Sequence, residues 1–64
     1  MTPAEERRAR DDLYQEALTA LAKARVAHWS WDAWGESEAL GEALGLVEAL
    51  LHAADESKEE ERPR

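Results

Sequence analysis

The sequence predicts an all-α protein, an antiparallel helical hairpin that self-associates into a dimeric four-helix bundle. Apolar residues recur every three or four positions in two long segments, and a Trp- and Gly-containing stretch separates them. A chain of 64 residues buries only about 60% of its unfolded surface. Because it has no cysteine, it has neither disulfides nor thiolate zinc sites to compensate. Self-association is the remaining route to a stable core.

The first helix is predicted over about 3–30. Thr2 fits the N-cap, Pro3 the first helical position and Glu5 the third, which together form a capping box. The apolar stripe that follows steps by about 3.5 residues and has a second apolar row beside it, as expected of a core-facing helix. The stripe comprises Leu13, Ala17, Ala20, Ala24, Ala27, Trp31 and Trp34, and the second row begins with Tyr14, Leu18 and Leu21.

The corner of the hairpin is predicted within 29–37, with two alternatives for its details. In one, the first helix ends at Gly35, the usual residue just past a helix end. In the other, Ser30 caps the second helix and Asp32 lies in its first turn. The second alternative makes two arms of nearly equal length, about 40 Å each, which bury more surface. Ser37 is a further capping candidate.

The second helix is predicted over about 38–57, so that 1–57 form a single domain and 58–64 a disordered acidic tail. Small residues recur at every fourth position of this helix and include Gly41 and Gly45. Each glycine inside a helix costs about 1 kcal/mol relative to alanine, which a close approach by another helix or ring would explain. The predicted seam of this helix comprises Leu40, Leu44, Val47, Leu51 and Ala54, with Ala43 and Leu50 beside it.

The residues expected to form the core and the self-association surface come from both helices. Thirteen alanines let helices approach closely but bury little area, and this favours association between chains. The predicted residues are Leu13, Leu18, Leu21, Leu40, Gly41, Leu44, Gly45, Val47 and Leu51.

All three tryptophans lie within 28–35, and two interpretations are open. The rings could close the end of the hairpin by packing over Gly41 and Gly45. They could instead form a binding patch, since tryptophan is enriched at interaction hot spots. On a continuous helix Trp31 and Trp34 can share a face while Trp29 lies off it, so Trp29 is the first candidate for a partner contact.

The charge of the chain is strongly acidic and asymmetric. A net charge of −7 argues against binding to nucleic acid or to an anionic membrane. Between Val26 and Ser57 there are several acidic residues and no Lys or Arg. This pattern indicates either an ordinary solvated face or a docking site for a basic protein surface, including mimicry of DNA. The predicted partner-binding residues are Trp29, Trp31, Trp34, Glu38 and Glu42.

No catalytic residues and no cofactor are predicted. His28 with Asp32, and Glu48 with His52, have the four-residue spacing of helical metal ligands. In one hairpin, however, the two pairs would lie about 20 Å apart, so no metal site is expected. The predicted function is a non-enzymatic interaction protein, such as a regulatory or inhibitory subunit or an adaptor. The alternatives are a purely structural self-assembling bundle and a bundle that binds a metal or small ligand.

A cytoplasmic location is expected. The chain has no apolar run of about 18 residues that would span a bilayer, and its N-terminus has no apolar signal-peptide core. Arginine outnumbers lysine, alanine is abundant, and Asn and Ile are absent, which indicates a GC-rich bacterial or phage genome.

Overall fold

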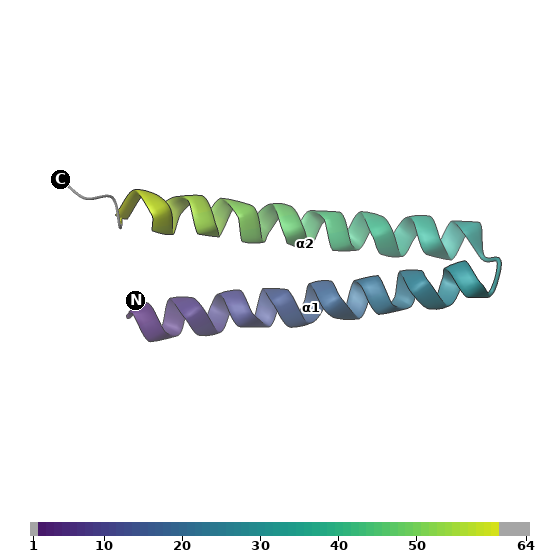
Figure 1. The fold of residues 1–64 in the computed structure, drawn as a ribbon, viewed down its shortest axis with the longest axis horizontal. Coiled ribbons are helices and arrows are strands. Elements are labelled where there is room, and N and C mark those ends of the chain that lie inside the picture. The colour runs from purple at the N-terminus through teal and green to yellow at the C-terminus, as the bar shows by residue number, and fades with distance from the viewer. Residues whose placement is uncertain (1, 61–64) are drawn as a thin grey trace.

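The computed structural model is an antiparallel hairpin of two helices (Figure 1). It describes residues 2–60, with the side chains of 2–56. Helix α1 spans Pro3–Trp29 and helix α2 spans Ala33–Glu60. They lie side by side in a body 52 Å long, 19 Å wide and 13 Å thick, with the turn at one end and the start of α1 and the end of α2 at the other. The predicted all-α hairpin is therefore confirmed.

Helix α1 begins with the capping box that its sequence predicts. The backbone N–H of Glu5 donates to Thr2 Oγ1 at 3.2 Å, and the N–H of Thr2 donates to Glu5 Oε2 at 3.3 Å. Two backbone donors that the helix leaves without partners are satisfied in this way. The carboxylates of Glu5 and Glu6 also lie at the positive end of the helix dipole, where negative charge is stabilising.

Helix α1 ends in a left-handed turn of the Schellman type. The N–H of Trp31 donates to the carbonyl of His28 at 3.3 Å, and the N–H of Asp32 donates to that of Ala27 at 2.9 Å. Trp31 has a φ of 59°, a left-handed conformation that this motif usually assigns to glycine. The chain therefore reverses direction in three residues, with a tryptophan at the position that favours glycine.

Helix α2 is capped by Asp32, and neither Ser30 nor Ser37 has this role. Asp32 Oδ1 accepts a hydrogen bond from the N–H of Gly35 at 3.0 Å. Gly35 does not terminate α1 but lies in the first turn of α2, without a positive φ. A Cβ at Gly35 would overlap the Asp32 carboxylate, so the missing side chain leaves room for the cap.

The two helices meet along a seam made mostly of alanine. Its residues recur in steps of three and four, the spacing of coiled-coil packing. The α1 stripe predicted from sequence lies in this seam, except for Trp31 and Trp34, which lie beyond the end of α1. The buried residues are Ala17, Ala20, Ala24, Ala39, Ala43 and Leu50, and the half-buried ones include Leu13, Ala27, Leu46 and Ala53.

The seam of α2 is centred one row away from the predicted leucine row and includes Ala43 and Leu50, which the prediction placed beside that row. Leu40, Leu44, Val47 and Leu51 are all about half exposed, whereas the row one residue earlier in the chain faces α1. Both rows have the same spacing, so periodicity does not distinguish them. Small side chains on α2 fit the small side chains of α1 and let the backbones approach closely. The leucine row is left on the surface of the hairpin.

Helix α2 continues to Glu60, beyond the predicted end near 57. Residues 61–64 of the predicted acidic tail lie outside the described residues. Among the described residues, neither helix is long and apolar enough to cross a membrane.

Gly41 and Gly45 lie on open surface. A Cβ added at either position would meet no atom within 4 Å, so no ring or helix of the same chain approaches them. We expect Gly41→Ala and Gly45→Ala each to raise the free energy of unfolding by about 0.5–1 kcal/mol, because alanine favours the helix. Urea denaturation of each variant measures this change.

Gly35→Ala is the matched control, because its new methyl group would displace the capping carboxylate of Asp32. That variant should gain less stability than the other two, or lose stability. A loss of stability at Gly41 or Gly45 would instead show that a second chain packs on these glycines.

Candidate interaction surfaces

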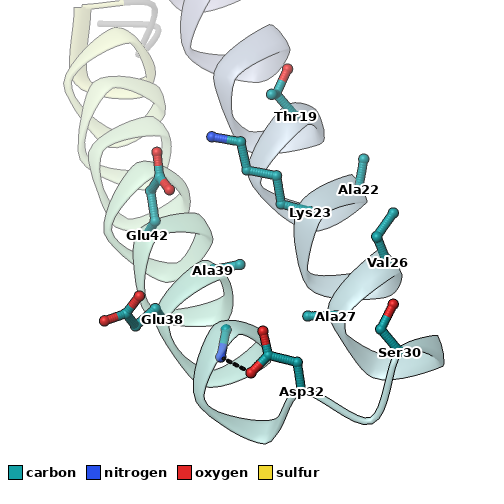
Figure 2. A pocket seen from close by; sticks show the side chains of 11 residues that line it. Thr19, Ala22, Lys23, Val26, Ala27, Ser30, Asp32, Glu38, Ala39 and Glu42 are labelled. Atoms are coloured by element: carbon teal, nitrogen blue, oxygen red, sulfur yellow. Dashed lines mark hydrogen bonds between the residues drawn. The ribbon is translucent and has the colours of Figure 1, made fainter.

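The two broad faces of the hairpin differ in composition. A groove of about 670 Å³ runs along one of them between the helices. Its lining includes Thr19, Lys23 and Val26 of α1 and Glu38 and Glu42 of α2, so these residues share a face (Figure 2). We call this the acidic face, defined by these five residues.

The opposite broad face is apolar. In α1, Tyr14, Leu18 and Leu21 flank the seam on the side away from Thr19 and Lys23, as the 100° step of the helix requires. In an antiparallel pair the corresponding flank of α2 lies on the same side. The apolar face therefore comprises Tyr14, Leu18, Leu21, Leu40, Leu44, Val47 and Leu51.

Each of these seven side chains is about half exposed. Scattered apolar side chains are normal on a protein surface, but a contiguous group of this size marks an interaction site or an aggregation hazard. Among the residues predicted for self-association, Leu13 is half-buried in the seam, whereas Gly41 and Gly45 are exposed and open. The other six lie on the apolar face.

On the acidic face, Glu38 and Glu42 project from one side of α2, one helical turn apart (Figure 2). Lys23 extends from α1 toward α2 at the mouth of the groove. Both carboxylates belong to exposed residues, so a partner can reach them without unfolding any part of the hairpin.

The three tryptophans form an exposed corner at the turn. Their exposed fractions are 72% for Trp29, 94% for Trp31 and 82% for Trp34. The rings therefore do not close the end of the hairpin over Gly41 and Gly45, which is the packing interpretation of the sequence. Trp31 is the most exposed, although spacing points to Trp29 first. We call Trp29, Trp31 and Trp34 the tryptophan corner.

A side-chain contact joins the helices at the base of this corner. His28 Nδ1 lies 2.9 Å from Glu36 Oε2, and the His28 ring makes an edge contact with that of Trp29, with centroids 5.7 Å apart. His28 and Asp32 have the four-residue spacing of neighbours on a helix, but Asp32 caps α2 instead. Glu36 is half-buried at the top of the seam, so His28 links α1 to α2.

The second histidine contacts the acidic residue that follows it in α2. His52 Nε2 lies 3.1 Å from Glu56 Oε1, four residues later, and Glu48 has the same spacing on the other side. Within the part of the chain that the structure describes, no three His, Cys, Asp or Glu residues gather to hold a metal ion. These histidine pairs therefore carry no metal proposal.

Sequence reasoning missed the special position of Trp31. It placed this residue in the apolar stripe of α1, whereas the residue follows the helix and has a left-handed backbone. Comparison with known proteins finds no matching family model, curated protein or solved structure. What this chain does must therefore be inferred from its own surfaces.

Proposed function

We propose that this protein is a non-enzymatic interaction module of the cytoplasm. Two copies associate through their apolar faces into a four-helix bundle. The dimer then presents the tryptophan corner and the acidic face to a protein partner, in the manner of a small regulatory subunit or an adaptor.

The left-handed backbone conformation of Trp31 is the main observation in support of partner binding. A left-handed backbone costs a non-glycine residue about 1–2 kcal/mol, and the ring, which is 94% exposed, recovers almost none of this by packing. A strained residue that does not stabilise its own fold is typical of a functional site. Tryptophan is also the residue type most enriched where binding energy concentrates.

The apolar face supports self-association separately. Its leucines contribute little to the hairpin, whose own interface is built mainly of alanine. In a four-helix bundle the same leucines would form the core. Because the acidic face lies on the opposite side, a dimer built in this way leaves Glu38 and Glu42 accessible, together with Trp31 and Trp34 at the turn.

The partner is best described as a basic protein surface. Helix α2 has exposed carboxylates and, within residues 33–57, no Lys or Arg. Complementary charge of this kind accelerates encounter and selects against acidic competitors. The exposed rings at the corner would supply the apolar contact that charge alone does not provide.

Charge reversal on the acidic face tests this proposal. We expect Glu38→Lys with Glu42→Lys to weaken partner binding by at least about tenfold while leaving helix content unchanged. Partners are first captured from extracts of cells that naturally produce the protein. The affinity of each captured partner for the wild-type protein and for the variant is then measured by titration.

The matched control is Glu48→Lys with Asp55→Lys, which changes the net charge equally on exposed positions of α2 outside the acidic face. This variant should retain the partner. Equal affinity of both double variants would exclude the acidic face as the docking site. A protein that captures nothing but itself would instead be a purely structural bundle.

A further inference from the structure

We propose that the second copy docks on the apolar face in the antiparallel sense, so that the two tryptophan corners lie at opposite ends of the dimer. In this arrangement Arg25 of each copy faces the partner's Asp11. The inference rests on the proposed homodimer and adds its topology.

Three residues of α1 are evenly spaced about Leu18. Asp11, Leu18 and Arg25 are separated by seven residues each, so they form one line along the exposed side of the helix, with Leu18 in the middle. All three belong to exposed residues. A two-fold axis at Leu18, perpendicular to the helices, brings each Arg25 onto the partner's Asp11. Two ion pairs then bracket the apolar contact.

The pattern of α2 is symmetric about the same level. Seam residues at equal distance from the turn lie side by side, which places Ala17 near Leu46 and Ala20 near Ala43. Leu18 is therefore level with the midpoint between Leu44 and Val47.

The same two-fold axis sets Leu44 against the partner's Val47 and Leu40 against the partner's Leu51. Every large residue of α2 on this face meets another apolar residue. A single two-fold axis therefore pairs the charged residues of α1 with opposite charges and the apolar residues of α2 with apolar residues.

The parallel alternative lacks this match. With the two-fold axis along the helices, α1 packs against the partner's α2. In the same register Arg25 lies level with position 38 of the partner's α2, where the nearest residue of the apolar face is the partner's Leu40, and Asp11 lies level with position 52, beside the partner's Leu51. A carboxylate placed against apolar side chains without a cation is costly. The charges therefore favour the antiparallel dimer over the parallel one.

The face is large enough for a second copy. The broad side of the hairpin on which it lies is 52 by 19 Å, an outline larger than the roughly 800 Å² that each partner contributes to a standard protein interface. Charged residues lie at both ends of the apolar group, as in the polar rim of such interfaces. The two corners would then point in opposite directions along the bundle.

Electron paramagnetic resonance distances test the topology directly. The chain has no cysteine, so Ser30→Cys places a single spin label beside each corner of the full-length protein. Residue 30 lies twelve positions from Leu18, or about 18 Å along the helix. We expect the two labels of a dimer to be separated by about 40 Å. A separation below about 30 Å would establish the parallel arrangement and overturn the inference.

A charge-swap cycle tests the named ion pair. Arg25→Asp and Asp11→Arg should each weaken dimerisation by about fivefold to tenfold, because each creates two like-charge contacts. The double variant should restore most of the affinity. Effects that simply add in the double variant would exclude the contact between Arg25 and the partner's Asp11.

Sedimentation separates the two possible failures. If the wild-type protein is a monomer at micromolar concentration, the proposed homodimer is wrong and the topology fails with it. If it is a dimer with a short label distance, the homodimer holds and only the antiparallel arrangement fails.

Discussion

Replacing Leu18 and Leu44 together with glutamate is expected to dissociate the proposed dimer, weakening its association by at least about a hundredfold. Both side chains lie at the centre of the apolar face, where the second copy would bury them. Each substitution removes apolar contact and places an unpaired carboxylate in the interface, and both changes oppose association. Sedimentation velocity measures the dissociation, and circular dichroism measures the helix that is lost with it.

Val26→Glu is the matched control for this experiment. Val26 is 66% exposed and Leu18 is 60% exposed, so neither contributes much to the hairpin alone, but Val26 lies on the acidic face. The Val26 variant should remain dimeric. If the Leu18 and Leu44 variant also remains dimeric and stable, the apolar face is not the dimer interface.

Trp31→Gly is expected to abolish partner capture while raising the free energy of unfolding by about 1 kcal/mol. Glycine adopts the left-handed conformation at this position without the steric cost that tryptophan incurs. The ring that is lost is almost fully exposed, so little packing is lost with it. Capture from cell extract and urea denaturation, performed on the same variant, give the two readouts.

Trp31→Ala separates the contribution of the ring from that of the backbone. Alanine removes the ring but still disfavours the left-handed conformation, so this variant should lose the partner without the gain in stability. A Trp31→Gly variant that unfolds more easily would show that the ring packs against the protein. A variant that still binds the partner would move the binding site to Trp29, Trp34 or the acidic face.

Much of the fold follows from local sequence signals. The capping box of α1, the alanine stripe from Ala17 to Ala24 and the absence of β-pattern are each readable without a structure. These features depend on neighbouring residues in the chain, which a sequence displays directly.

The choice between adjacent rows on α2 could not be read in the same way. The rows beginning at Ala39 and Leu40 have equal spacing, and burial of the larger side chains favours the leucine row. Which row faces α1 depends on the turn, because a three-residue connection sets the rotation of α2 about its axis. The turn itself was hard to predict, since it places Trp31 where glycine is usual.

The histidine pairs illustrate the same limit. His28 and Asp32 have the spacing of neighbours on one helix, but Asp32 lies beyond the end of α1 and is engaged by the backbone of Gly35. The true partner, Glu36, belongs to the other helix and comes within reach only after the chain reverses. Contacts across the turn are tertiary, and periodicity within one helix does not report them.

The alanine seam has a consequence for how much of this protein is folded in a cell. Alanine burial contributes little transfer free energy. Most of the apolar surface that could stabilise the protein is on the exposed leucines, which a single hairpin does not bury. In such a homodimer, folding and assembly become one equilibrium, and the melting temperature rises with concentration. Dilution would unfold the chains and expose them to proteases, whereas abundant synthesis would protect them. The expression level would thereby set the folded fraction, and the protein would persist only when it is made in sufficient amount.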